Sequence, residues 1–178
     1  MNKQLIAKLA LIALGTVAGA AHADQTTSSF VVKMTITKTC KVNTASIADI
    51  DLGTVAATDV AVSQTGSTTF KVNCSKGTPF YIGLAPSNGN ANGAGVMSGT
   101  GSNTDKVPYN LYSNSGYSTP WGNTATTTAV GNGMQGTGKG MSNSPTDNTV
   151  SFIAYAKATN SDFTPDNYKD TVTVNVNY

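Results

Sequence analysis

The sequence has 178 residues, with 11 Lys, nine Asp, a single His and neither Arg nor Glu. A chain without Arg lacks the side chain that binds phosphate or guanine through two parallel hydrogen bonds. His and tuned carboxylates carry out most acid–base catalysis near neutral pH, so a mature chain without His, Arg and Glu, as expected below, would lack most enzyme mechanisms.

The first 23 residues have the pattern of a secretory signal peptide. Lys3 and Lys8 stand near the start, an apolar run extends from Leu9 to Val17, and Ala21-His22-Ala23 fits a cleavage site. Cleavage would leave a chain that begins at Asp24, with nine Lys, nine Asp, no His and a net charge of zero. The balanced charge argues against nucleic-acid binding, and the apolar run is too short to span a bilayer.

After the signal peptide, Thr, Ser, Asn and Gly dominate, and no long stretch has the apolar period of a helix. This composition predicts an all-β fold. The first predicted strand covers residues 30–37, where Phe30, Val32, Met34 and Ile36 alternate on one face. It begins only six residues after the cleavage site, whereas new N-termini are normally polar and frayed.

Two interpretations of this N-terminal strand are open. The strand either pairs within its own sandwich or leaves its subunit and completes the sheet of a neighbour, which is a form of β-augmentation. Periodicity alone does not decide between them. We accordingly divide the chain into a signal peptide (1–23), an N-terminal segment (24–38) and a domain (39–178).

Cys40 and Cys74 are the only cysteines of the chain. In an exported protein, such a pair predicts a disulfide, which would stabilise the fold by about 4 kcal/mol in the chain-entropy model. Two free buried thiols are the alternative. A metal site is less favoured, because two cysteines without a His provide too few soft ligands.

Further alternating or apolar runs predict the remaining strands and give about seven in all. They are Phe70–Cys74, Phe80–Ala85, Val107–Ser113, Thr124–Val130, Thr149–Lys157 and Val172–Tyr178. Seven short strands favour an immunoglobulin-like β-sandwich, with a closed barrel as the alternative. Two long connections, 86–106 and 131–148, contain Asn-Gly turn signals that would fold them into hairpins, and their role is open.

Two groups of residues provide the remaining candidates for chemistry. Asp49 and Asp51 would share a face of a strand, as in a glycosidase pair or part of a calcium site. Trp121 and the tyrosines Tyr109, Tyr112 and Tyr117 would form a platform for sugar stacking. In both cases the structural explanation is favoured, since carboxylates at strand edges are commonly solvated and strand aromatics usually pack in cores.

Four motifs stand out when they are taken together: Tyr109-Asn110-Leu111-Tyr112, Trp121-Gly122, Asp51-Leu52-Gly53 and the C-terminal run from Tyr168 to Tyr178. In combination they resemble the spore coat U family, which includes the secreted pilins of archaic chaperone-usher pili. The likeness extends to the alternating strand ahead of Cys40 and to Cys74, so that it covers essentially the whole mature chain.

The resemblance implies an incomplete immunoglobulin-like sandwich that lacks its last strand. A periplasmic chaperone would fill the resulting groove until an outer-membrane usher exchanges it for the N-terminal strand of another subunit. Phe30, Val32, Met34 and Ile36 match the donor side chains of that strand. Val172, Val174, Val176 and Tyr178 match the strand that borders the groove and pairs with the chaperone, and Cys40 and Cys74 match the family's disulfide.

We therefore expect a structural pilin and not an enzyme, with no cofactor and no metal. It would be exported through the periplasm and polymerise into an extracellular fimbrium for surface attachment and biofilm formation, with a separate tip adhesin. The first alternative is a monomeric secreted coat or carbohydrate-binding sandwich, whose N-terminal strand would pair within its own chain. The second is a hydrolase that uses Asp49 and Asp51.

Overall fold

The computed structural model describes residues 24–43, 47–142 and 148–178. The predicted signal peptide, with its cleavage site, lies outside the described residues. The chain divides into two compact units, residues 1–35 and 36–178. In the described part of the first unit, residues 24–35, no strand is formed and every residue is exposed.

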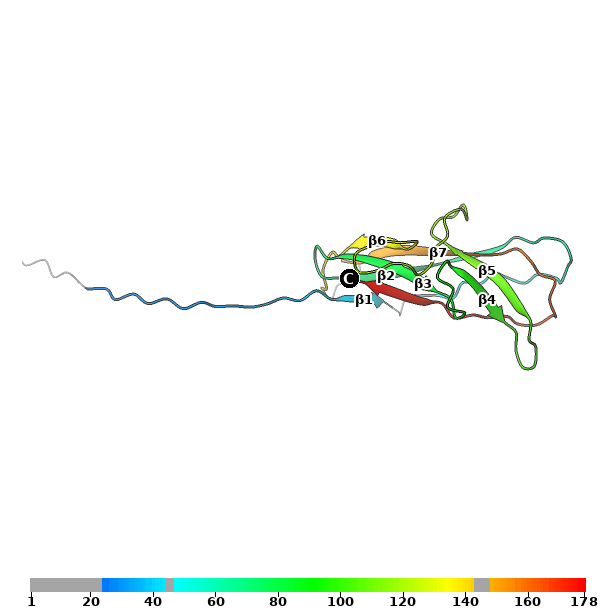
Figure 1. Ribbon diagram of the computed structural model, residues 1–178, viewed down its shortest axis with the longest axis horizontal. Helices are drawn as coiled ribbons and strands as arrows, with labels where there is room; N and C mark the ends of the chain where they lie inside the picture. The colour runs from blue at the N-terminus through cyan, green and yellow to red at the C-terminus, as the bar shows by residue number, and fades with distance from the viewer. Residues whose placement is uncertain (1–23, 44–46, 143–147) are drawn as a thin grey trace, which may run out of the picture. The chain divides into compact units, whose positions relative to one another are not determined.

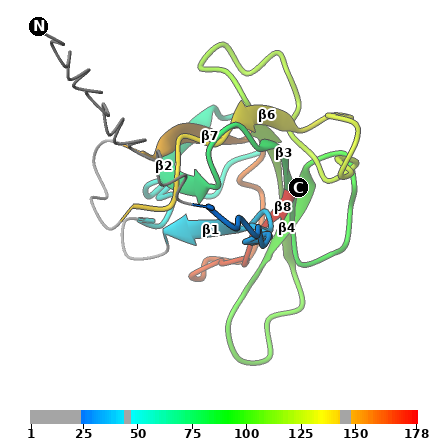
Figure 2. The ribbon, with the colours of Figure 1, turned by 90° about the vertical axis from the view of Figure 1, so that its left-hand side faces the viewer.

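The second unit is built from antiparallel strands in two sheets, and no helix long and apolar enough to cross a membrane occurs among the described residues. The larger sheet has the order β1 (Cys40–Asn43), β2 (Gln64–Cys74), β7 (Val150–Ala158), β5 (Lys106–Tyr112), β4 (Ala94–Ser98). The smaller sheet has the order β6 (Met134–Thr137), β3 (Pro79–Ala85), β8 (Thr173–Asn177). Figures 1 and 2 show these strands layered around a common interior.

Alternation of apolar and polar residues places one face of each long strand in the core. In β2, Phe70, Val72 and Cys74 are buried, and the residues between them are less covered. Phe70 lies opposite Phe152 of β7 in the ladder, with the two ring centroids 5.8 Å apart. The indole of Trp121 is fully buried against Phe70 and donates a 3.0 Å hydrogen bond to the carbonyl of Ile82 in β3, which ties the two sheets together.

The strand order is that of an immunoglobulin-like sandwich with one position empty. In such sandwiches one sheet has the order A-B-E-D and the other contains C, F and G. The run β1-β2-β7-β5 corresponds to A-B-E-D, and the pair β3-β8 corresponds to C and F. No strand of the described residues pairs with the outer edge of β8, where G would lie.

The predicted all-β class is confirmed, and five of the predicted strands correspond to β2, β3, β5, β7 and β8. The predicted strand Thr124–Val130 is wrong. In its place Thr126 forms a local turn, in which its Oγ1 accepts hydrogen bonds from the amides of Thr128 and Ala129. The predicted strand at residues 30–37 is not a strand in this structure.

Candidate functional site

An apolar groove opens along the side of the second unit, between residues 47–52 and residues 168–174. Its volume is about 690 Å³. Its floor consists of core side chains, each almost fully buried, that belong to both sheets: Phe70, Leu84, Leu111, Ala154 and Ala156. In a complete sandwich another strand would cover such side chains, so the groove corresponds to the empty strand position next to β8.

The first wall of the groove, residues 47–52, runs beside the N-terminal half of β2 without joining its ladder. Side chains of β2 hold it instead. Thr68 Oγ1 donates a 2.7 Å hydrogen bond to the carbonyl of Ala48, and Gln64 Nε2 donates a 3.0 Å bond to that of Leu52. The wall approaches β2 so closely that a Cβ at Gly66 would lie 2.5 Å from the carbonyl oxygen of Asp51. A side chain at position 66 would therefore push this wall away.

The second wall includes the start of β8, which pairs on one side only, with β3. The alternate residues of this C-terminal run are half-buried and pack against the core: Val172, Val174, Val176 and Tyr178. Val172 and Val174 line the groove. On the outer side of β8, backbone groups have no strand partner among the described residues. This edge is therefore available for a further strand.

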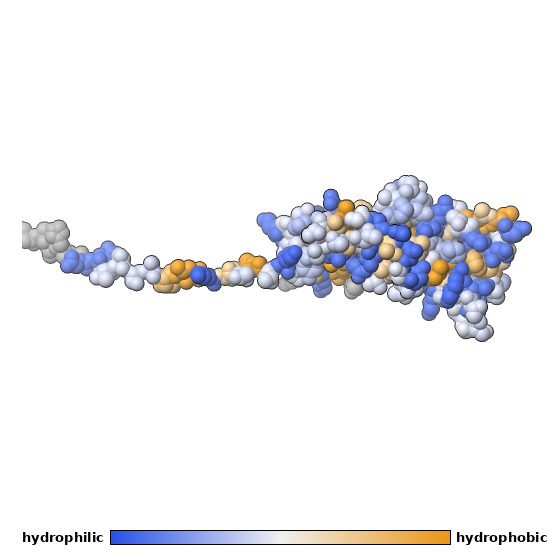
Figure 3. Space-filling model, in the orientation of Figure 1, coloured by the Kyte–Doolittle hydropathy of each residue, from blue (hydrophilic) through white to orange (hydrophobic). Residues whose placement is uncertain are grey.

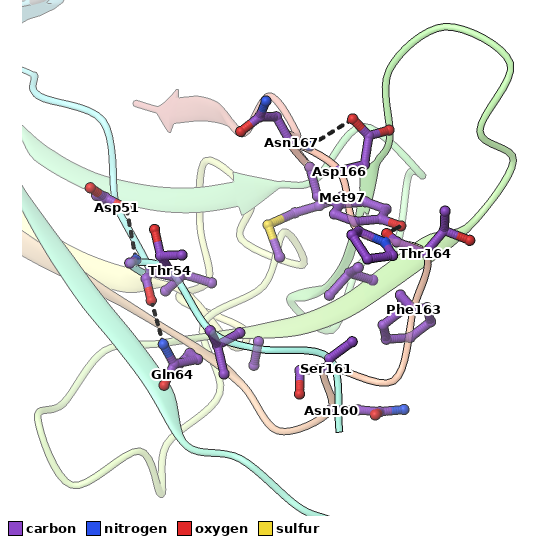
Figure 4. Close-up of a pocket in the computed structure, with 18 of the residues that line it drawn as sticks. Asp51, Thr54, Gln64, Met97, Asn160, Ser161, Phe163, Thr164, Asp166 and Asn167 are labelled. Atoms are coloured by element: carbon purple, nitrogen blue, oxygen red, sulfur yellow. Dashed lines mark hydrogen bonds between the residues drawn. The ribbon is translucent and has the colours of Figure 1, made fainter. Parts of the chain in front are cut away.

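The groove continues into a second hollow at the end shown in Figure 4. The two cavities share Ile50, Asp51, Leu52, Met97 and Tyr168, so that they form one continuous depression. Phe163 and Ser161 line the far end of it. Together the two cavities are lined along residues 47–55 and along residues 160–174.

A carboxylate holds the far end of the second wall in place. Asp166 accepts hydrogen bonds from the backbone amide and hydroxyl of Thr100, from Asn103 Nδ2 and from the amide of Asn167. Stabilisation of the charged form by Thr100, and then by Asn103, lowers the pKa of Asp166 well below the usual range. Asn103 Nδ2 also donates to the hydroxyl of Tyr168, a residue that lines both cavities. The loop between β4 and β5 therefore fixes the wall.

A second carboxylate fixes the middle of the same wall. The hydroxyl of Tyr109, in β5, donates a 2.7 Å hydrogen bond to Asp170 Oδ2, and Asp170 Oδ1 accepts the amide of Thr171. Burial raises the pKa of Tyr109 far above its usual range, and the hydrogen bond to Asp170 and the charge of that carboxylate raise it further. Tyr109 therefore stays a hydrogen-bond donor at every physiological pH.

Residues 30–36 contribute the opposite kind of surface, a run of exposed apolar side chains. Phe30, Val32, Met34 and Ile36 are each at least 80% exposed. Figure 3 shows the apolar atoms of residues 30–36 uncovered. Soluble proteins rarely leave such a row of large apolar side chains in water without a partner. The predicted donor residues are therefore not part of a sheet within their own chain in this structure.

The spore coat protein U domain model matches residues 26–175, which include both the exposed segment and the groove. The chain belongs to the spore coat protein U domain family. No curated protein matches this chain. Among solved structures, a match is the crystal structure of the CsuC-CsuE chaperone-tip adhesion subunit pre-assembly complex from archaic chaperone-usher Csu pili of Acinetobacter baumannii. The sequence identity is 22% and the TM-score is 0.49, and the match covers 81% of this chain but only 40% of that chain.

The disulfide of this spore coat protein U domain joins Cys40 in β1 to Cys74 in β2, which lie directly opposite each other in the ladder. The predicted pairing is therefore present. Cys74 is fully buried and belongs to the core, and Cys40 packs against it. The disulfide fastens the chain to the sandwich at the point where the exposed segment ends.

The carboxylates Asp49 and Asp51 have a structural setting in this domain. Both are exposed and lie on the first wall of the groove. Asp51 Oδ1 accepts a 2.7 Å hydrogen bond from the amide of Gly53, which forms a local turn. Among residues 24–43, 47–142 and 148–178, no group of three His, Cys, Asp or Glu is placed to hold a metal ion.

The structural explanation favoured for the aromatic side chains is confirmed for Trp121, which is fully buried, and for Tyr109, which is nearly so. Tyr112 and Tyr117 do pack edge to face near the surface, with ring centroids 5.6 Å apart. The sequence did not single out three residues of the groove and its walls, namely Met97, Asp166 and Asp170, as candidates. Met97 falls in a stretch expected to be loop, and Asp166 and Asp170 stand between strands, where carboxylates are ordinary. Their partners, 61 to 66 residues earlier in the chain, became visible only in the fold.

Proposed function

We propose that this chain is a structural subunit of a chaperone-usher pilus, which polymerises when the N-terminal segment of one copy occupies the groove of another. One observation carries the proposal. The chain has an open apolar groove beside the outer edge of β8, which pairs with no strand of the described residues, and it also has an exposed segment with the side-chain period of a strand. The groove lacks a strand, and the segment lacks a sheet to pair with.

The segment supplies the side chains and the groove supplies the backbone partner. Burial of Phe30, Val32, Met34 and Ile36 would contribute roughly 6 to 12 kcal/mol. Ordering about ten residues costs roughly 10 to 20 kcal/mol of backbone entropy, so burial alone does not suffice. The free edge of β8 offers the additional main-chain hydrogen bonds, and the fixed walls reduce the cost of forming the site.

The proposed partners follow from this mode of assembly. A subunit with an open groove exposes core side chains, so a periplasmic chaperone would cover the groove until an outer-membrane usher adds the next copy. Val172, Val174, Val176 and Tyr178 would border the bound strand in both complexes. The product would be an extracellular fimbrium that serves surface attachment and biofilm formation. The described part of residues 39–178 forms one sandwich, and we assign the shaft of the fibre to this chain and receptor binding to a separate tip adhesin.

Catalysis has no part in the proposal, and neither a cofactor nor a metal is required. The buried position of Trp121 also favours the pilus subunit over a sugar-binding domain that would use this indole. In this proposal the chain acts by exchanging strands between subunits.

The test uses fibres sheared from the cell surface and separated by non-reducing gel electrophoresis, with and without boiling. The intact chain should give a ladder of multimers that boiling removes, and a chain that lacks residues 24–36 should give none. Met34→Asp should also abolish the ladder, because it would bury a charge in the groove. Thr35→Asp is the matched control: it places the same charge on the opposite face of the segment and should leave the ladder intact.

Two results would contradict the proposal. A normal ladder from Met34→Asp would show that this side chain does not enter a groove. A folded monomer that never forms a ladder, and that is destabilised when residues 24–36 are removed, would show that the segment belongs to its own sandwich. The monomeric coat or carbohydrate-binding protein would then be the better interpretation.

A further inference from the structure

The chain is clamped to the sandwich one residue before β1 begins. The amide of Thr39 donates a 3.0 Å hydrogen bond to Ser75 Oγ, and the amide of Ser75 donates a 2.9 Å bond to the carbonyl of Thr39. The hydroxyl of Ser75 also donates to that carbonyl, at 3.2 Å. The disulfide between Cys40 and Cys74 adjoins this pair. We call these four residues the exit clamp.

The exit clamp fixes the direction of the backbone at Thr39. Thr39 and Ser75 extend the register in which Cys40 lies opposite Cys74, so the chain at residue 39 still follows the line of β1. β2 ends at Cys74, and Ser75 already belongs to the turn that leads to β3, since its carbonyl accepts the amide of Thr78. Ile36, three residues before Thr39, is 80% exposed.

A segment that entered its own groove would have to reverse its direction before the clamp. Ile36 is the last residue that the groove would bind, and only Thr37 and Lys38 separate it from Thr39. Neither Gly, Asn, Asp nor Pro occurs between residues 30 and 39. These are the residues that tight reversals require, whereas β-branched residues such as Ile36 and Thr37 favour extended backbone.

The reversal matters because self-insertion would otherwise prevail. A segment joined to its own groove by a short flexible linker has an effective concentration of about a millimolar, far above the concentration of other copies. Without a constraint, each chain would close on itself and no polymer would grow. We infer that the exit clamp of Thr39, Cys40, Cys74 and Ser75 prevents self-insertion and so makes a second copy of this chain the occupant of the groove. This inference rests on the proposed function.

The experiment places one cysteine in the segment and one in the groove of the same chain. Val174→Cys supplies the groove position, and it is combined in separate variants with a cysteine at position 30, 32, 34 or 36. Thr35→Cys is the matched control, because position 35 lies on the other face of the segment. Peptide mapping of the oxidised, exported chains identifies each cross-link and verifies that Cys40 and Cys74 remain paired. A mixture of chains with one added cysteine each verifies cross-links between copies.

A second set of variants carries the insertion Gly-Asn-Gly-Ser between Lys38 and Thr39, which leaves the exit clamp unchanged but supplies a turn ahead of it. We expect the parent variants to give cross-links between chains, with little or no cross-linked monomer. The insertion should convert most of the product into cross-linked monomer, since the intrachain reaction then has the concentration advantage.

Three outcomes would contradict either the inference or the proposed function. Cross-linked monomer as the main product without the insertion would overturn the inference while leaving the groove as the binding site of the segment. Products between chains that persist unchanged after the insertion would show that something other than the clamp prevents self-insertion. Absence of any cross-link from positions 30, 32, 34 and 36, or equal cross-linking from position 35, would overturn the proposed function itself.

Discussion

The hydroxyl of Tyr109 lies 2.7 Å from a carboxylate oxygen of Asp170, and this hydrogen bond joins the larger sheet to the chain that leads to β8. Two backbone hydrogen bonds between Ser98 of β4 and Lys169 join the same parts of the structure. Both residues line the groove. Asp170 belongs to the second wall of the groove and Tyr109 to β5, so the contact ties this wall to the larger sheet. Side-chain hydrogen bonds therefore hold this wall of the groove in place.

Tyr109→Phe should weaken the fold, because it removes the donor and leaves the Asp170 carboxylate with one partner fewer. Loss of a hydrogen bond to a charged group typically costs about 1.5 to 3 kcal/mol. Urea unfolding, followed by the fluorescence of Trp121, the only tryptophan of the chain, measures this change in the free energy of unfolding. Tyr112→Phe is the control, since no hydrogen bond to the Tyr112 hydroxyl occurs in the described structure. Equal effects of the two substitutions would contradict the role of Asp170.

Gly95→Ala should disturb the same contact from the other side of the ring. Gly95 pairs with Tyr109 across the β4–β5 ladder, and a Cβ at position 95 would overlap the phenol ring. The ring would have to shift, which would disturb its hydrogen bond to Asp170, and such overpacking costs about 1 to 3 kcal/mol. Gly116→Ala is the matched control, because its nearest neighbour would be a side-chain nitrogen 3.3 Å away. Urea unfolding of both variants should show a large decrease in the free energy of unfolding for Gly95→Ala only.

Sequence periodicity predicted the strands that have a clear apolar face and missed those that do not. β2 and β7 are long enough for alternation to be visible, and their buried positions agree with it. β4 and β6 have the sequences AGVMS and MQGT and lie in the two stretches expected to be long connections. Their identity as strands comes from pairing with β5 and β3, which are long-range contacts that no local pattern encodes.

The candidate site was predictable only in part for the same reason. The sequence singled out the exposed segment, the C-terminal run and the two cysteines, because each has a local pattern or a rare residue type. The open groove itself depends on strand order, since β8 is an edge only because nothing joins its outer side in the described residues. The prediction of a groove beside Val172 and Val174 came from family resemblance and not from periodicity.

Asp166 should give the fold a characteristic acid sensitivity. Its pKa is lower in the folded chain than the ordinary value of about 3.9 that applies when the chain is unfolded. The unfolded state therefore takes up the proton first, so the stabilisation is complete above that ordinary value and is lost as the pH falls toward the lowered one. Asp166→Asn should lower the urea midpoint near neutral pH, and the difference from the parent chain should shrink as the pH is reduced below about 4.

Asp162→Asn serves as the control for that titration. Asp162 is exposed, and in the described structure its carboxylate accepts no hydrogen bond. Its substitution should shift the urea midpoint little at any pH. A difference between Asp166→Asn and the parent that stays constant from neutral pH to about pH 2 would mean that the substitution acts through packing and not through the charge of Asp166.

Removal of the disulfide, by Cys40→Ala together with Cys74→Ala, should cost about 2 to 5 kcal/mol of stability. The two cysteines are 34 residues apart, so much of the effect should come from the greater freedom of the unfolded chain. An unfolded chain without this link also exposes more surface, and the dependence of the unfolding free energy on urea should therefore become steeper. Ser75→Ala is the comparison, because it removes hydrogen bonds at the same place but keeps the covalent link. A lower urea midpoint with an unchanged slope in the Ala pair would locate the loss in the folded state, where Cys74 is a buried part of the core.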